Sequence, residues 1–325
     1  MKRRNLSVML SCMVVVIGIL LSMTSVFAAY PEKAVTLIVV WGAGGNNDVT
    51  ARKLADVMQK YFPKRVVVVN RPGGAGTVGT AEIVAAKPDG YTIGSTTMSP
   101  VTIKPHTMSL PYKTPDDYIP IAMVGSQAIS LGINSDLPFK TLKDFIEYAK
   151  VNPGKLKVNH GGIGHISHLI FEQLSFQAKI DMVDVPFPGG GEQIAAVLGK
   201  HTEGALVPLS DLYPQVQAGK VRVLAMADEK RNPTFPDVPT FKELGYDLTM
   251  ITYTLLIGPN GIPQDIVSKI QDAYKKVSND PDFIKFMEER GYTVQFEGTE
   301  VLRKRLWNDY KANKDIFQRI GQKKK

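Results

Sequence analysis

The chain has 325 residues, a single cysteine and a formal net charge of +8. One cysteine excludes a fold held by disulfides, and a chain of this length can bury a sufficient core without them, in one large domain or two ordinary ones. The positive charge is spread along the chain without a basic, aromatic-studded run, so we expect no nucleic-acid partner.

The first residues predict export. A basic start at Lys2 to Arg4 precedes the aliphatic run Met13 to Leu21, and Val26-Phe27-Ala28 offers small residues at the cleavage positions. The run is too short to span a membrane comfortably and has no stop-transfer flank. Cys12 precedes the apolar core, whereas a lipid-acceptor cysteine would follow it. We therefore predict a cleaved signal peptide over residues 1–28 and a periplasmic location or one on the extracellular face of the cell envelope.

Short apolar runs follow, and many of them are rich in β-branched residues and bounded by Gly, Pro or Asn. The strand candidates are Val35–Trp41, Val66–Asn70, Tyr91–Ser95, Ile119–Val124, Ile129–Ile133, Leu156–Asn159, Met182–Pro186, Gly204–Pro208, Val221–Ala227 and Met250–Ile257. Because helix-period segments alternate with these runs, we expect parallel sheets covered by helices, an α/β fold class.

The helical segments have recognisable faces and ends. Apolar stripes lie between Leu54 and Tyr61 and between Leu142 and Ala149, and Thr141 with Asp144 resembles a capping box. The C-terminal part differs, because no long strand interrupts it. It predicts consecutive helices at Gln264–Ser278, Pro281–Arg290 and Thr299–Ile320.

One glycine pattern raises the question of a nucleotide. Gly74, Gly76 and Gly79 have the spacing G-x-G-x-x-G between a strand candidate and a helix, as in dinucleotide sites. Such a site needs an acidic residue at the end of the next strand. That strand ends Ser95-Thr96-Thr97, and the nearest acid, Asp89, lies in a turn before it. We therefore expect no dinucleotide and no other cofactor.

A second glycine loop, Gly42 to Asp48, follows the first strand candidate and also precedes a helix. Small residues at a helix start leave backbone N–H groups exposed, and these groups favour an anion such as a carboxylate. The alternative is that the glycines only permit tight turns. Two such loops at the carboxyl ends of neighbouring strands favour a ligand site, since open α/β sheets bind ligands there.

Several longer blocks occur together in order along the mature chain. They include YPEKAVTLIVVWGAGGNNDV, NRPGGAG, AAKPDGYTI, VDVPFPGGGEQIAAVLGK, AGKVRVLAM and PDVPTFKELG. With them, the chain resembles the solute receptors of tripartite tricarboxylate transporters, often called the Bug family. The resemblance extends over essentially the whole mature chain.

The resemblance implies a fold like that of type II periplasmic binding proteins, with two α/β lobes and a ligand cleft between them. Lobe 1 would comprise residues 30–126 and 251–325, and lobe 2 residues 127–250. Hinge closure would trap a mono-, di- or tricarboxylate or a related organic acid without catalysis. The implied partners are the membrane subunits of a tripartite tricarboxylate-type transporter, or a sensor receptor, and we expect the receptor itself to be a monomer.

The resemblance also implies which residues bind the ligand. Two glycine loops of lobe 1 would hold a carboxylate, and the third strand and the loops of lobe 2 would complete the site. The candidates are Trp41, Gly42, Ala43, Gly44, Gly45, Asn46, Asn47, Asp48, Gly74, Ala75, Gly76, Thr77, Thr96, Thr97, Ser99, Gly162, His165, Ser167, His168, Pro188, Gly189 and Gly190.

The chain departs from the family pattern at three of these positions. Asn46 and Asn47 replace a small residue and a Thr or Ser, and their amides could bond the ligand directly. His165 stands where Ser is usual and offers an extra donor or charge. Trp41 either stacks on a ligand or packs as an ordinary strand aromatic.

Two other functions have some support in the sequence, a metal-binding receptor and a secreted hydrolase. His165, His168 and Glu172 have the spacing of one helix face and could bind a metal together with His160. Gly164 lies among them and no dense His/Asp/Glu tract accompanies them, so capping and packing roles are favoured and no metal is expected. A secreted hydrolase of carboxylate esters or amides would need a nucleophile motif, but the chain has no G-x-S-x-G. We therefore expect no enzyme.

Overall fold

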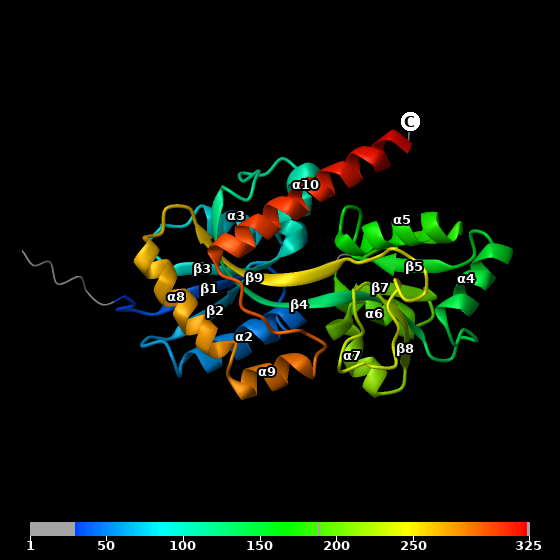
Figure 1. The fold of residues 1–325 in the computed structure, drawn as a ribbon, viewed down its shortest axis with the longest axis horizontal. Helices are drawn as coiled ribbons and strands as arrows, with labels where there is room; N and C mark the ends of the chain where they lie inside the picture. Colours follow the sequence, from blue (N-terminus) through cyan, green and yellow to red (C-terminus); the bar gives the residue numbers. More distant parts are fainter. Residues whose placement is uncertain (1–29, 188, 324–325) are drawn as a thin grey trace, which may run out of the picture. The chain divides into compact units, whose positions relative to one another are not determined.

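The computed structural model describes residues 30–187 and 189–323, so the predicted signal peptide lies outside the described residues. By its internal contacts the chain divides into two units, and the boundary between them lies after Glu32. All the helices and strands discussed below belong to the unit Lys33–Lys325 and are drawn in Figure 1.

The first lobe is built on three parallel strands: β1 (Val35–Val39), β2 (Val66–Asn70) and β3 (Thr92–Thr97), with β1 in the middle. Helix α2 (Asn46–Met58) joins β1 to β2. A 3-10 turn (Gly74–Gly76) and α3 (Thr77–Val84) join β2 to β3. Because the strands are parallel, their carboxyl ends meet at one edge of the sheet, and the starts of α2 and α3 lie at that same edge.

Two long strands pass between the lobes. Strands β4 (Tyr118–Asn134) and β9 (Ile251–Pro259) run antiparallel side by side (Figure 1). The strands predicted separately at Ile119–Val124 and Ile129–Ile133 are both parts of β4, so the prediction of two strands was wrong. The polar residues Ser126 and Gln127 interrupt the apolar pattern, yet their backbones pair with β9, which keeps the strand continuous.

The second lobe surrounds the far end of β4. Its strands are β5 (Lys157–His160), β6 (Val183–Pro186), β7 (Gly204–Pro208) and β8 (Val221–Met226). Its helices are α4 (Leu142–Val151), α5 (Ile166–Ala178), α6 (Gly190–Leu198) and α7 (Leu209–Gln217). The predicted parallel pairing is confirmed for β1–β3 and β5–β7, but β4 pairs antiparallel with β7, β8 and β9. The full sheet has the order β2-β1-β3-β9-β4-β7-β5-β6, with β8 on β4.

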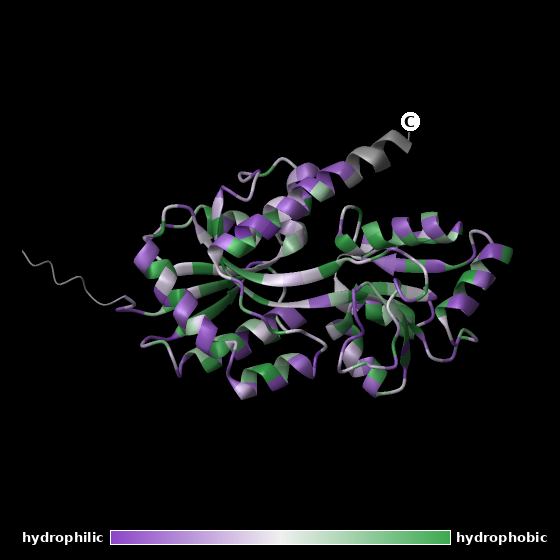
Figure 2. Cartoon of the chain, viewed as in Figure 1, coloured by the Kyte–Doolittle hydropathy of each residue, from purple (hydrophilic) through white to green (hydrophobic). Residues whose placement is uncertain are grey.

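The predicted C-terminal helices are α8 (Gln264–Val277), α9 (Pro281–Glu288) and α10 (Thr299–Lys323). Helices α8 and α9 pack on α2, and the Tyr274 hydroxyl of α8 donates to the Val124 carbonyl of β4 at 2.6 Å. Helix α10 is mainly hydrophilic (Figure 2), but Leu302 and Leu306 on its inner face are fully buried. The chain after β9 therefore returns to the first lobe.

Local signals in the second lobe match the structure as well. The predicted capping box is confirmed, because Thr141 accepts from the Asp144 backbone N–H while the Asp144 side chain accepts from the Thr141 N–H. In the part of the chain that the structure describes, none of the helices combines the length and apolar character needed to cross a bilayer.

Candidate functional site

A cleft of about 730 Å³ lies where the carboxyl ends of the parallel strands of both lobes face each other. The loops after β1, β2, β5, β6 and β7 line it, together with the ends or middles of β3, β4 and β9. The candidate residues on its wall are Trp41, Gly42, Ala43, Gly44, Gly45, Asn46, Asn47, Gly74, Ala75, Gly76, Thr97, His165, Gly189 and Gly190.

Other candidates do not line the cleft: Asp48, Thr77, Thr96, Ser99, Gly162, Ser167 and His168. Apart from Gly162, these residues are buried behind the wall, where their side chains bond to the loops and helices that form it or pack against them. Pro188 lies outside the described residues.

The first wall loop joins β1 to α2 through Gly42–Gly45. Gly44 has a φ of +79°, and Gly45 is the N-cap of α2 with no capping side chain. Asp48 accepts from the Gly44 backbone N–H at 2.8 Å and from Asn70 Nδ2 at 2.9 Å, and it pairs with Arg52. Burial alone would raise the pKa of Asp48, but these hydrogen bonds outweigh it and hold the pKa below its usual value. Asp48 thus stabilises the loop through the Gly44 N–H, and Arg52 compensates its charge.

The second wall loop joins β2 to α3 and is wound in the left-handed region. Gly73, Gly74, Ala75 and Gly76 all have positive φ, which is unusual for Ala75 because it has a Cβ. Gly79, the third glycine of the G-x-G-x-x-G spacing, has a different structural role. A Cβ on Gly79 would lie 2.6 Å from the Arg71 carbonyl oxygen, so this glycine permits close packing of α3 on the strands.

On the facing lobe, His165 is the N-cap of α5. Its Nδ1 accepts from the Ser167 backbone N–H at 3.3 Å and from the Ser167 hydroxyl at 2.7 Å. Burial, with Lys104 nearby, lowers the pKa of His165 to about 3. The ring is therefore neutral, with its proton on Nε2, so it offers the cleft a hydrogen-bond donor and no charge.

The same pair bears on the hydrolase alternative, since a serine bonded to a histidine resembles a nucleophile and its base. Ser167 is fully buried and its hydroxyl also accepts from the Gly161 N–H at 3.0 Å. A histidine whose pKa is lowered to about 3 is also a poor general base near neutral pH. The pair therefore holds the 161–165 loop and is badly suited to attack a substrate.

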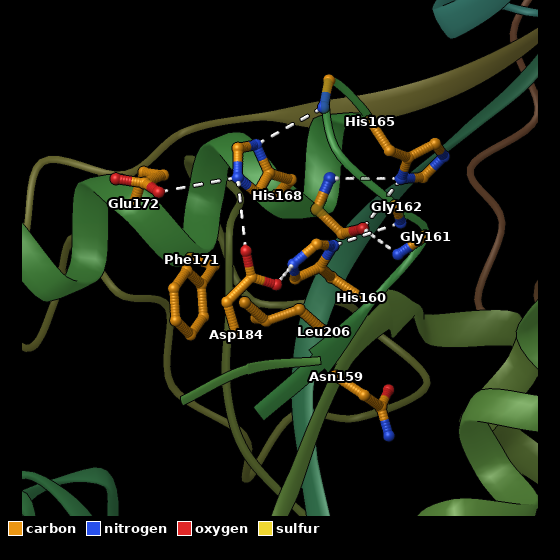
Figure 3. Close-up of polar contacts among 12 residues, drawn as sticks. Asn159, His160, Gly161, Gly162, His165, His168, Phe171, Glu172, Asp184 and Leu206 are labelled. Carbon is orange, nitrogen blue, oxygen red and sulfur yellow. Dashed lines mark hydrogen bonds and ion pairs between the residues drawn. The ribbon is translucent and has the colours of Figure 1, made fainter. Parts of the chain in front are cut away.

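His160 and His168, the other two histidines of the metal alternative, form a separate cluster behind this loop. Figure 3 shows His160 and His168 turned toward Asp184, whereas His165 lies apart from them. His160 Nε2 bonds Asp184, and His168 Nε2 lies 3.5 Å from Glu172 and 3.9 Å from the second Asp184 oxygen. One atom each of His160, His168 and Asp184 could meet at a single metal ion.

The tautomers of the His160 and His168 rings argue against a metal ion bound between these histidines and Asp184. The Gly162 N–H donates to His160 Nδ1 at 3.1 Å, and the Gly164 N–H donates to His168 Nδ1 at 3.4 Å. Each Nδ1 is thus an acceptor, which leaves the proton of the neutral ring on Nε2. A ligating histidine shows the reverse arrangement, with its metal-free nitrogen donating. The cluster instead ties the glycines of the wall loop to β6 and α5.

The most informative residue that sequence reasoning missed is Asp211, in the first turn of α7. Asn46 Nδ2 donates to its Oδ1 at 2.5 Å. Burial raises the pKa of Asp211 to about 6, although the Asn46 amide favours the charged form. Its place at the carboxyl end of β7 was the available signal, but no motif marks it.

Other lining residues were missed as well, among them Gln127, Thr252 and Thr254 on the crossing strands and Glu192 and Gln193 on α6. The Thr254 hydroxyl donates to Asn47 Oδ1 at 3.2 Å. Asn46 and Asn47, which the sequence offered as direct ligand contacts, are therefore both bonded to other parts of the protein.

Comparisons with known proteins agree with this architecture. A family model described as tripartite tricarboxylate transporter family receptor matches residues 50–322. The UPF0065 protein in the gbd 5' region of Cupriavidus necator is 30% identical over 292 residues, which cover 90% of this chain and 89% of that protein.

Solved structures match over nearly their whole length. One described as a periplasmic transporter has a TM-score of 0.84 and 32% identity, covering 89% of this chain and 98% of its own. MatC from Rhodopseudomonas palustris with bound malate has a TM-score of 0.80 and 26% identity, covering 88% of this chain and 99% of its own. The predicted fold class, two α/β lobes as in periplasmic binding proteins, is confirmed.

Proposed function

Because the chain belongs to the tripartite tricarboxylate transporter receptor family, we propose that it captures a small carboxylate outside the cytoplasm and delivers it to the membrane subunits of such a transporter. A sensor receptor is the alternative destination. Binding and release need no chemical step, so the protein acts as a receptor and not as an enzyme.

The observation that carries this proposal is the start of α3 at the cleft. Its N-cap is Gly76, no side chain caps it, and its first turn holds no acidic residue. The first N–H groups of a helix have no partner within the helix, and the helix dipole adds a partial positive charge there. The Thr77 N–H bonds to the Gly74 carbonyl and the Val78 N–H to the Gly73 carbonyl, so a carboxylate at this turn meets the positive end of the helix dipole and a glycine-rich backbone without bulky side chains.

The solved neighbour MatC, which binds malate in its crystal, supports a carboxylate as the ligand. Its identity to this chain is 26%, so the exact acid can differ. We assign the ligand class as a small organic acid held first by the loops of lobe 1.

We further propose the lobe division of residues 30–126 with 251–325 and residues 127–250. Strands β4 and β9 pass between the lobes at this division, and their pairing from Tyr118 to Ala128, with register shifts at Pro120/Ala122 and Met123/Gly125, would form a two-strand hinge. Closure of the lobes around the acid would exclude water and strengthen its hydrogen bonds. Export through the predicted signal peptide would place the receptor in the periplasm or on the outer face of the envelope.

A thermal-shift panel tests this function. Ligands that bind only the folded protein raise the melting temperature in proportion to their saturation. We expect at least one mono-, di- or tricarboxylate to raise it in a concentration-dependent way, and neutral sugars of similar size to leave it unchanged. A shift with sugars and none with any carboxylate would contradict the proposal.

A further inference from the structure

The charges on the cleft wall are unusual for a receptor of polyanions. Among the described residues that line it, two are carboxylates, Glu192 and Asp211, and none is a lysine or an arginine. His165 on the same wall is neutral. Lys104 lies behind the wall, where its Nζ donates to the Ile163 carbonyl at 3.4 Å. A ligand with two or three carboxylates would thus meet no cation at its second end.

The N-termini of the helices around the cleft also differ in the acidic and capping side chains that they carry. In lobe 2, α5 is capped by the His165 ring, α6 carries Glu192 in its first turn and α7 carries Asp211 in its first turn. In lobe 1, α2 carries Asp48, whereas α3 has no acidic residue and no capping side chain. Among these five helices, α3 is therefore the one whose start carries neither an acidic nor a capping side chain, so its dipole is the least compensated, although its first N–H groups bond to the Gly73 and Gly74 carbonyls.

Asp211 lines the cleft from lobe 2, whereas the Gly73–Gly76 loop lines it from lobe 1. Its Oδ1 accepts from Asn46 Nδ2 at 2.5 Å. Its Oδ2 lies against the start of α6, where a Cβ on Gly190 would be only 2.5 Å from it. The protein's own carboxylate thus faces the Gly189–Gly191 turn, and it keeps lone pairs that can accept from a donor in the cleft.

We propose that Asp211 selects a ligand with one carboxylate and a protonated amine, an amino-carboxylate zwitterion. The carboxylate binds at the start of α3 and the ammonium group donates to Asp211. This inference rests on the proposed function and narrows its ligand class. Charge-assisted hydrogen bonds of the ammonium group favour the zwitterion, while like charge on Asp211 disfavours a dicarboxylate.

Calorimetric titration of the wild-type protein with matched trios tests the selection. Each trio has one chain length and differs at one end: β-alanine, propionate and malonate, or γ-aminobutyrate, butyrate and succinate, extended over the neighbouring lengths. We expect a zwitterion to bind at least about tenfold tighter than both of its partners. A dicarboxylate that binds as tightly as its zwitterion overturns the inference and leaves the proposed function standing. Absence of binding by every carboxylate contradicts both.

Two variants test whether Asp211 is the residue that selects the zwitterion. Asp211→Asn keeps the shape and the Asn46 bond but removes the charge, so we expect the zwitterion to bind at least about tenfold more weakly. Asp272→Asn is the matched control, because it makes the same change at an exposed carboxylate of α8 that does not line the cleft. Unchanged zwitterion affinity in Asp211→Asn, or an equal loss in Asp272→Asn, overturns the role of Asp211. The wild-type trios decide the ligand class even where a variant fails to fold.

Discussion

Asn46 and Asp211 are joined across the cleft by a hydrogen bond of 2.5 Å, from the amide Nδ2 at the start of α2 to the carboxylate Oδ1 at the start of α7. The two residues are far apart in sequence and belong to different lobes of the proposed division. The bond therefore links the first glycine loop directly to the facing wall. It also places a charged group from lobe 2 beside a loop proposed to hold the ligand.

Because burial disfavours the charged form of Asp211, we expect this residue to lower the stability of the folded protein as the pH rises. Burial raises the pKa of Asp211 to about 6 in the folded protein, from 3.8 for an unperturbed carboxyl group. Below the lower value both states are protonated and no penalty exists. Between the two values the unfolded state loses its proton first, so stability falls as pH rises, and above the higher value the penalty is complete.

Asp211→Asn should accordingly melt at nearly the wild-type temperature at about pH 4 and a few degrees higher at about pH 7. Thermal melts of the ligand-free proteins across this range measure the difference. A variant that is less stable than the wild type at about pH 7 would show that the charged form of Asp211 is the favoured one.

His165 should change stability with pH in the opposite direction. Its pKa is lowered to about 3 from 6.5, so the unfolded state takes up a proton first as pH falls, and stability is lost from about pH 6.5 downward. His165→Asn keeps an oxygen that can cap α5 but does not titrate, so it should lose less stability than the wild type between about pH 7 and pH 4. His201→Asn, at an exposed histidine, is the control and should follow the wild type. Parallel acid-dependent loss in His165→Asn and the wild type would refute this.

Glycine substitutions separate binding from stability. A Cβ at Gly42 meets no atom within 4 Å, so Gly42→Val should fold normally and obstruct the cleft, weakening carboxylate binding at least about tenfold. Gly76 is unsuitable for this purpose. It has a φ of +90° and a Cβ there would lie 2.7 Å from Pro100, so Gly76→Ala should cost about 1–3 kcal/mol of stability.

Urea unfolding and calorimetric titration give both quantities for each variant. Ala312→Val, at an exposed position of α10, is the control for added side-chain volume away from the cleft. Full carboxylate affinity in Gly42→Val would remove the first glycine loop from the site.

The histidine cluster should not bind zinc stoichiometrically. Because backbone N–H groups occupy the Nδ1 atoms of His160 and His168, metal binding at Nε2 would require both hydrogen bonds to break. Calorimetric titration with zinc should show only weak, non-stoichiometric heat. A stoichiometric site that His160→Ala abolishes and His201→Ala retains would contradict this tautomer assignment.

Much of the framework could be predicted from the sequence because its signals are local. Runs such as Val66–Asn70 are rich in β-branched residues, and the Thr141 capping box depends on neighbouring residues alone. The two glycine loops were also recognisable, since both follow neighbouring strands and precede helices, where open α/β sheets bind ligands. The structure places most of both loops on the cleft wall.

The rest depended on contacts that the sequence does not display. Ser126 and Gln127 looked like the end of a strand, and only pairing with β9 makes them part of β4. Asp211 has no motif around it, and its importance arises because α7 brings it to Asn46 from 165 residues away. Likewise, the neutral state of His165 follows from burial and from Lys104, which a pattern of residue types cannot reveal.

A crystal structure with the tightest-binding carboxylate tests the central claim most directly. We predict the ligand in the cleft, with a carboxylate oxygen accepting hydrogen bonds from the Gly74 and Ala75 backbone N–H groups, in the turn before α3. A carboxylate bound instead at the start of α5 or α6, or outside the cleft, would contradict it.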